Sequence, residues 1–509
     1  MGAQSSKDSR KSVSFDEKRA HASAAAEIQE AYFTANRTSS SSQLYLAETL
    51  ECLGLDDDQI RDRYAPVTTE SLTKYSKDFW KEPKNKLALN AVVGHDPSQV
   101  LVNRSQAVRE NHIFNVKIDP EGSATNQRSS GRCWLFAGTN VLRLAVIERY
   151  QLKDDFELSQ SYLYFYDKLE KSNWFLENMI DLADKDIDDR VVQYLLSDPV
   201  SDGGQWDMFV NLVQKYGVVP KSVFPETYSS SNSGRLNKLV VVKLREFASQ
   251  IRKALDDGVS TSTVRVLKEQ MMEEIYRILV ICLGEPPSTF DWEANDKNNK
   301  FIGVRNLTPV KFFKEHVKYP IAKTLSLIND PRNPYEKLYT VSRLGNIVGG
   351  GPIRYVNTQA ETLKKLAINV LKSGRPVWFG CDVGQSSSSA IGAMDTKIFD
   401  YELAFNVTFG LTKKQRLLYG ESLMTHAMVF TGVHLDENGT PIRWRVENSW
   451  GENSGDHGYW IMSDAWFSEF VYQIVLNKDD VPRKLSDLLN TDPTVLPAYD
   501  PMGSLASPH

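Results

Sequence analysis

The chain has 509 residues, 41% of them apolar and 25% charged, a composition typical of a globular protein with room for a large core. Its 60 basic and 65 acidic residues give a net charge of −5, which excludes a global attraction to nucleic acid but leaves a local basic surface open. No apolar stretch reaches the ~18 residues that span a bilayer, and we expect no secretion signal because the first residues lack an apolar core.

Residues 1–65 are polar, include the serine run "RTSSSSQ", and predict a poorly ordered extension. Their start, "MGAQSSK", fits the acylation pattern M-G-x-x-x-[ST], with Gly2 as the acceptor of a myristoyl group; the alternative is a plain polar tail. A single acyl chain anchors a protein only marginally, so membrane association through Gly2 would be partial. Three acidic residues disfavour a mitochondrial presequence, although a mitochondrial fraction stays open: Asp8, Asp16 and Glu17.

Helical patterns dominate residues 66–234, which we interpret as one half of a folded core. "TTESLTKYSKDFW" is typical of a capped helix start, and "CWLFAGTNVLRLAVIERY" and "GGQWDMFVNLVQKYG" carry apolar residues three and four positions apart. Residues 235–335 form a charged, helix-rich segment that we interpret as an insertion. Its longest helical pattern, "STVRVLKEQMMEEIYRILVICLG", ends at Gly284.

Short β-like runs replace the helical patterns in residues 336–478, among them "AMVFTGVHL", "IRWRVENSW" and "YWIM". The remaining residues, 479–509, are punctuated by prolines and end in "LPAYDPMGSLASPH". A helical first half followed by a β-rich second half predicts an α+β fold.

The four cysteines are widely spaced and form no C-x-x-C pair, which disfavours a zinc site or a dithiol redox motif: Cys52, Cys133, Cys282 and Cys381. Few, scattered cysteines in a chain of this length are typical of a reducing compartment, so we predict a cytoplasmic protein. We expect neither a metal ion nor an organic cofactor.

Cys133 stands at the rim of an apolar helix rather than inside it, after the turn Ser129-Ser130-Gly131-Arg132. A thiol attacks as its thiolate, and the amide groups at a helix N-terminus stabilise negative charge. The position therefore predicts a lowered thiol pKa and a nucleophile. The alternative is a packed core cysteine, which the apolar context "ILVICLG" indicates for Cys282.

A cysteine nucleophile needs a general base, and the base needs a group that orients it. His426 opens an apolar strand, the hairpin turn "DENGT" follows, and the return strand ends at Asn448. His426 lies 12 residues before Asn438 and Asn448 lies nine residues after Gly439, so the hairpin brings both to the same end. The alternatives are a hydrogen-bonded edge histidine and a turn-forming asparagine.

Two further residues complete this candidate site. Gln127 lies six residues before Cys133, and its side-chain amide, with the backbone N–H of Cys133, could donate to a developing oxyanion. The alternative for Gln127 is a loop residue that makes a local hydrogen bond. Trp450 could cover the His426–Asn448 pair and exclude water.

These residues resemble the active site of papain-type cysteine peptidases. The stretch from Ser130 to Trp134 matches part of the pattern C-G-[SA]-C-[WY] around the papain cysteine. The Gly203-Gly204 pair resembles the papain loop whose backbone pairs with an extended substrate; the alternative is a simple helix-entry loop. His426 follows Cys133 by 293 residues instead of about 130–150, so roughly 150 residues are inserted.

The inserted residues and both flanks resemble one branch, the bleomycin hydrolase family. The similar stretches are "NQRSSGRCWLFAGTN", "FELSQSYLYFYDKLEK", "DGGQWDMF", "ESLMTHAMVFTG", "RVENSWG" and "LPAYDPMGSLA". The resemblance covers about residue 70 to 506 and is more specific than a lone motif, because it includes the insertion and the C-terminal end.

The resemblance implies a papain-like cysteine peptidase core, with residues 235–335 as a helical hook and residues 479–509 as a C-terminal arm that enters the active site. It implies a cytoplasmic cysteine aminopeptidase that acts on peptides and on amides such as bleomycin and assembles as a homohexamer. In this family the terminal carboxylate of the arm pairs with the substrate's amino group. The match ends at Ala506, so we expect self-trimming of residues 507–509. Some members bind nucleic acid, an expectation that the net negative charge weakens here.

Two other functions stay open. A papain-like endopeptidase would cleave peptides with blocked amino ends, which an aminopeptidase would leave intact. A non-catalytic hexameric nucleic-acid-binding protein would keep the fold without the activity. The presence of all four active-site residues argues against this second alternative: Gln127, Cys133, His426 and Asn448.

Overall fold

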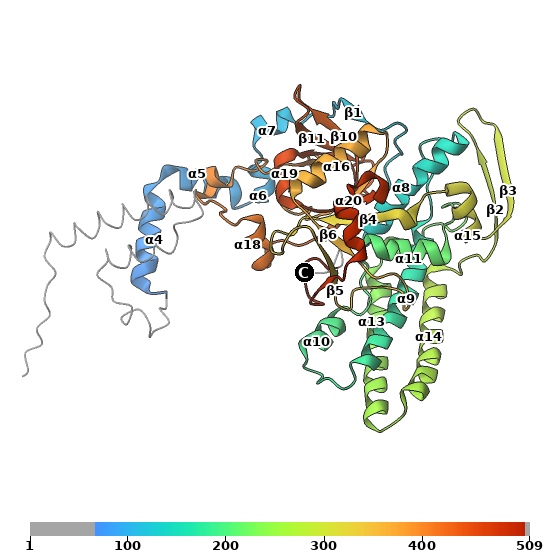
Figure 1. Ribbon diagram of the computed structural model, residues 1–509. Helices are drawn as coiled ribbons and strands as arrows, with labels where there is room; N and C mark the ends of the chain where they lie inside the picture. The colour runs from blue at the N-terminus through green and yellow to red at the C-terminus, as the bar shows by residue number, and fades with distance from the viewer. Residues whose placement is uncertain (1–66, 504–509) are drawn as a thin grey trace, which may run out of the picture. The chain divides into compact units, whose positions relative to one another are not determined.

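The structure is a computed structural model that describes residues 67–503 (Figure 1). Gly2, with the predicted N-terminal extension, and Ala506, with the predicted trimming point, lie outside the described residues, and these expectations stay predictions. Contacts divide the chain into two compact units. The described part of the first comprises residues 67–95 and 401–410, and that of the second comprises 96–400 and 411–503.

The first unit is helical. α4 (Thr69–Lys81) begins at the predicted capped start, where the Thr68 side chain accepts a hydrogen bond from the N–H of Ser71 (3.1 Å). α5 (Pro83–Val92) follows, and α17 (Tyr401–Phe405) joins from far along the sequence. None of these three helices buries a residue, and large apolar side chains lie exposed on them: Leu72, Tyr75, Trp80, Leu87 and Leu403.

Three long helices carry the helical half of the second unit: α8 (Cys133–Tyr150), α9 (Gln160–Asp181) and α11 (Trp206–Tyr216). Buried residues occupy all sides of α8, which makes it a central core helix. Four short helices also belong to this unit: α6 (Pro97–Val100), α7 (Arg104–Arg109), α10 (Arg190–Ser197) and α12 (Tyr228–Ser231).

The segment predicted as an insertion begins with two long helices, α13 (Gly234–Asp256) and α14 (Thr261–Leu283). They run side by side and extend together from the second unit (Figure 1). α14 ends at the predicted point, because Gly284 takes a positive φ of 86°. A hairpin that the helical pattern had not predicted follows, made of β2 (Phe290–Asn295) and β3 (Phe301–Leu307), and then α15 (Pro309–Phe312) and a π-helical turn at Phe313–Val317.

The described residues form one large sheet whose strands run in the order β14-β5-β6-β4-β13-β7-β10-β11-β12-β9-β8, with β1 beside β10. The strands are β1 (Val116–Lys117), β4 (Thr324–Ile328), β5 (Lys337–Val341), β6 (Tyr355–Asn357), β7 (Val377–Cys381), β8 (Ser387–Ser388), β9 (Ala393–Met394), β10 (His426–Leu435), β11 (Pro441–Glu447), β12 (Tyr459–Ser463), β13 (Val471–Asn477) and β14 (Thr494–Leu496).

Helices and short turns between these strands are α16 (Ala360–Lys372), α18 (Lys413–Leu418), α19 (Asp464–Phe470) and α20 (Arg483–Ser486), with 3-10 turns at Ile321–Lys323, Lys478–Asp480 and Asp487–Asn490. The predicted α+β fold is confirmed, because the long helices precede most of the sheet in the sequence. In the described part of the chain, no helix combines the length and apolar character needed to cross a membrane.

Candidate active site

Cys133 is the first residue of α8, which packs against β10. The side chain is fully buried, and its sulfur accepts hydrogen bonds from the backbone N–H groups of Trp134 and of Ala427 in β10. Ala427 directly follows His426, so the start of the helix meets the start of the strand. The structure therefore brings the predicted nucleophile next to the strand that carries the predicted base.

The predicted direction of the Cys133 pKa is wrong. Burial raises the pKa of the thiol to about 12, and the N–H groups of Ala427 and Trp134 oppose this shift without outweighing it. The charge of Asp202 adds to the increase. The helix start does donate hydrogen bonds to the sulfur, as expected, but the sequence could not show that the sulfur lies out of water.

His426 and Asn448 meet as the hairpin count predicted. β10 and β11 pair with Val429 opposite Glu447, which places the two residues at the same end of the hairpin. His426 Nε2 lies 2.9 Å from Asn448 Oδ1, and the same oxygen accepts the N–H of Ser449 (2.8 Å). Because Asn448 Oδ1 accepts both bonds, Nε2 carries the proton and Nδ1 keeps a free electron pair.

The environment keeps the imidazole neutral. Burial lowers the pKa of His426 to about 4, and the hydrogen bond with Asn448 opposes this shift. The ring of Trp450 lies over the imidazole, with centroids 5.0 Å apart, which is the covering position predicted for it. A neutral imidazole with a free Nδ1 can accept a proton from a thiol at neutral pH.

Gln127 is joined to the Asn448 segment by two contacts. Its backbone N–H donates to the carbonyl of Ser449 (2.8 Å), and its side-chain Oε1 accepts the hydroxyl of Ser449 (2.6 Å). Its Nε2 donates to the carbonyl of Ser130 (2.6 Å), which leaves one amide proton for another acceptor. Ser449 was missed as a site residue, although it stands between Asn448 and Trp450.

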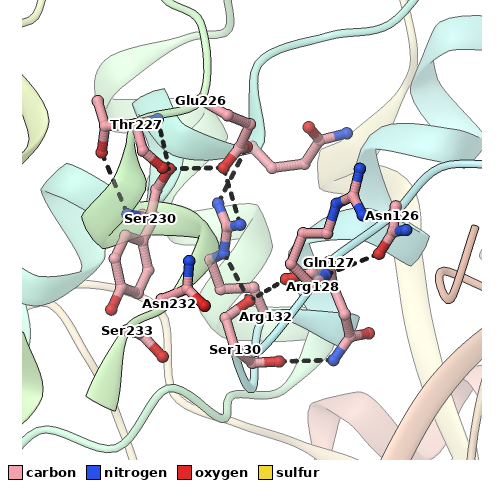
Figure 2. A network of polar contacts seen from close by, with 12 residues as sticks. Asn126, Gln127, Arg128, Ser130, Arg132, Glu226, Thr227, Ser230, Asn232 and Ser233 are labelled. Carbon is pink, nitrogen blue, oxygen red and sulfur yellow. Dashed lines mark hydrogen bonds and ion pairs between the residues drawn. The ribbon is translucent and has the colours of Figure 1, made fainter. Parts of the chain in front are cut away.

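An ion pair braces the turn that precedes Cys133. The guanidinium of Arg132 is fully buried and donates to both carboxylate oxygens of Glu226, at 2.8 and 3.0 Å (Figure 2). Its Nε also donates to the hydroxyl of Ser130 (2.9 Å). Since Arg132 is the N-cap of α8, this pair fixes the direction in which the helix leaves the turn.

Asp202, also missed from the sequence, connects the Cys133 turn to the glycine loop. Its carboxylate accepts the N–H of Gly131 (3.0 Å) and pairs with Lys168 of α9 (2.7 Å). Its backbone carbonyl accepts the indole N–H of Trp134 (2.7 Å). Three further groups donate to the carboxylate: Tyr164, Ser233 and Asn237. The sequence held one indication of such a residue: "YLYFYDKLEK" places lysines in an aromatic-rich helix, and a lysine that is buried needs a charged partner.

The predicted substrate loop, Gly203-Gly204, follows Asp202 directly. The buried ammonium of Lys171 donates to the carbonyl of Gly203. A Cβ on Gly204 would lie 2.6 Å from the ring of Trp134, so this position requires glycine. The next residue, Gln205, donates its side-chain N–H to the carbonyl of Gly503 and so joins this loop to the C-terminal segment.

The arrangement supports acyl transfer by a thiol. It combines a nucleophile on a helix start, a neutral base with a free nitrogen, and an amide near the nucleophile. Within residues 67–503, no three histidine, cysteine or acidic side chains gather as a metal site would require.

Comparisons with known proteins agree with this chemistry. The profile of the peptidase C1-like family matches residues 66–503. Bleomycin hydrolase of Homo sapiens is 44% identical over 450 residues, covering 86% of this chain and 99% of the relative. Aminopeptidase C of Listeria monocytogenes is 44% identical over 449 residues, with the same coverage. The crystal structure of PepW from Lactobacillus rhamnosis superposes with a TM-score of 0.84 at 46% identity, covering 86% of this chain and 99% of PepW.

Proposed function

The chain belongs to the peptidase C1-like family, with a papain-like fold, and is a cysteine-type aminopeptidase; from this premise we propose that Cys133, His426 and Asn448 remove residues from the free amino ends of peptides. The observation that supports this assignment is the convergence of the α8 start with the His426–Asn448 pair. Two relatives are named for aminopeptidase and bleomycin hydrolase activities, so we extend the proposal to amides such as bleomycin.

In the first half of the reaction, His426 Nδ1 takes the thiol proton as the Cys133 sulfur attacks the substrate carbonyl carbon. The carbonyl oxygen becomes an oxyanion, which the backbone N–H of Cys133 and the remaining amide proton of Gln127 stabilise. The imidazolium then donates its proton to the leaving amine. The C–N bond breaks and a thioester on Cys133 remains.

In the second half, His426 Nδ1 takes a proton from water, and the hydroxide oxygen attacks the thioester carbonyl. The same two donors stabilise the oxyanion. The C–S bond breaks, the sulfur takes the proton back from the imidazolium, and the free acid leaves. Asn448 holds the ring in one orientation through both halves.

The requirement for a free amino end is assigned to the C-terminal arm. We propose that the chain trims itself to Ala506 and that the new carboxylate pairs with the substrate's ammonium group. The docking of Gly503 beside the Gly203-Gly204 loop supports this proposal, because Ala506 follows Gly503 by only three positions in the sequence. Deleting residues from Leu496 onward is then expected to permit cleavage of peptides with blocked amino ends.

The homohexamer is likewise a proposal, supported by the first unit. Its helices bury no residue, and exposed apolar side chains such as Leu72, Trp80 and Leu87 favour burial against another surface. A second copy of the chain is the partner that the family resemblance implies. Light scattering in solution would measure the mass of the assembly. Acylation of Gly2 and a cytoplasmic location stay predictions.

The experiment for the catalytic assignment is Cys133→Ala. We expect the variant to fold with an unchanged circular dichroism spectrum and to lose hydrolysis of an unblocked aminoacyl amide. It is also expected to retain residues 507–509 by mass spectrometry, whereas the wild type loses them. Activity above about a percent of wild type would identify another nucleophile and refute the assignment.

A further inference from the structure

The last described residues are attached to the second unit at several points. β14 pairs in parallel with β5, and the N–H of Ser342 donates to the carbonyl of Leu496 (2.8 Å). Further along, the hydroxyl of Tyr355 donates to the carbonyl of Met502 (3.1 Å), and Gln205 donates to that of Gly503. The backbone from residue 494 to 503 therefore has a defined register relative to the sheet and the glycine loop.

A charged contact lies between these attachments. Arg332, in the turn that follows β4, donates from Nη2 to Asp500 Oδ1 (2.7 Å) and to Asp330 Oδ2 (2.8 Å). Asp330 is fully buried, and the side chains of Arg332 and Asp500 are only 12% and 7% exposed. Asp330 orients the guanidinium by also accepting its Nε (2.9 Å), so the other N–H of Nη2 points at Asp500.

The residue before this contact is also held. The ring of Tyr499 lies under the guanidinium of Arg190, 3.5 Å from the centroid, and beside the ring of Tyr194. Asp500 Oδ1 accepts the N–H of Met502 (2.8 Å), which closes a local turn at the point where the arm heads toward Gly503. The carboxylate of Asp500 therefore both closes the local turn of the arm and attaches the arm to Arg332.

We propose that Arg332 and Asp500 act as a register clamp: positioning residues that set how far the arm reaches into the active site and thereby impose the demand for a free amino end. This inference rests on the proposed arm function. Three residues after Gly503 span at most about 10 Å, and a slip of one residue along an extended chain moves its end by about 3.4 Å. An ion pair needs its atoms within about 4 Å, so a one-residue slip would separate a terminal carboxylate from the substrate's amine.

The clamp can be tested apart from the fold. β14 pairs with β5 through backbone bonds that do not involve Arg332, so removing the charged contact loosens the arm at Asp500 and leaves the strand in place. Asp500→Asn is the mildest change, because it keeps the oxygen that accepts the N–H of Met502 and removes only the negative charge that pairs with Arg332. A matched control is Asp480→Asn, which breaks the Arg375–Asp480 ion pair (2.6 Å) upstream of β14.

The readout is a ratio: kcat/KM for an N-acetylated peptide amide divided by kcat/KM for the same peptide with a free amino end. We expect Asp500→Asn and Arg332→Gln each to raise this ratio at least tenfold. The double variant should raise it no further than the larger single effect, because both changes abolish the same ion pair. Asp480→Asn is expected to stay within twofold of wild type.

The clamp is refuted if Asp500→Asn leaves the ratio within twofold of wild type. A purely structural role would give this result, because both rates would fall by the same factor. A truncation before Leu496 separates this failure from a failure of the arm itself. If the truncation raises the ratio and the clamp variants do not, the clamp alone is wrong. If the truncation also leaves the ratio unchanged, the arm function is wrong and the clamp falls with it.

Discussion

The carboxylate of Asp202 should be as necessary to the active thiol as residues that face the substrate. Its Oδ2 accepts from Gly131 and Ser233, and its Oδ1 accepts from Lys168, Tyr164 and Asn237. Asp202→Asn keeps the shape but supplies only one oxygen. Whichever way the amide turns, its NH2 group faces donors, either the N–H of Gly131 or the ammonium of Lys168.

The size of the effect follows from burial. Lys168 is fully buried and Asp202 is 8% exposed, and breaking one partner of a buried ion pair costs about 3–5 kcal/mol. The second unit has about 400 described residues, and unfolding entropy is about 2.1 cal/mol/K per residue, so the unfolding midpoint should fall by about 4–6 °C. Displacement of the Cys133 turn by about 1 Å would lower kcat/KM by about 10²-fold.

Two assays separate stability from positioning: thermal unfolding, and the rate at which a chloroacetamide alkylates Cys133. The matched control is Asp464→Asn, which removes the negative charge from the ion pair between Lys364 of α16 and Asp464 of α19 (2.7 Å). Both variants should lose stability, but only Asp202→Asn should lose alkylation rate and kcat/KM. If the two variants lose activity equally, the argument that Asp202 positions the thiol is wrong.

Other expectations concern the base and the oxyanion donor. Because the pKa of His426 is lowered to about 4, its imidazole is neutral above that pH, and kcat/KM should fall as the pH drops through about 4. Asn448→Ala removes a hydrogen bond that raises this pKa, so the acid limb should move to lower pH while kcat decreases; a limb that moves upward would contradict this. Gln127→Ala should lower kcat by about 10²–10³-fold. Ser449→Ala removes only the hydroxyl that orients Gln127, so its loss of kcat in steady-state kinetics should be smaller.

Local patterns were sufficient to predict much of the site. The turn before Cys133 and the apolar run after it predicted the start of α8, and counting from the Asn438-Gly439 turn predicted the His426–Asn448 contact. Both depend on residues close in sequence, where backbone geometry limits the outcomes. The α+β order followed from the same periodicities.

Features that depend on distant segments were not predictable. Asp202 takes donors from three segments before and after it, and no spacing rule relates Gly131, Lys168 and Asn237. The sign of the Cys133 pKa shift depends on how completely the sheet covers the sulfur. The grouping of residues 401–410 with residues 67–95 is likewise a matter of tertiary contact.

The network around Asp202 that connects the turn before Cys133 to the Gly203-Gly204 loop has a practical consequence. It consists of a carboxylate, an ammonium group and backbone amides, and the cysteines of the described residues, Cys133, Cys282 and Cys381, are all unbridged. Millimolar glutathione or dithiothreitol, which would open a cystine brace, therefore protects the nucleophile without loosening its support. Salt screens this buried pair little, so acid strong enough to protonate the carboxylate, rather than a reducing agent, is the condition that should take this active centre apart.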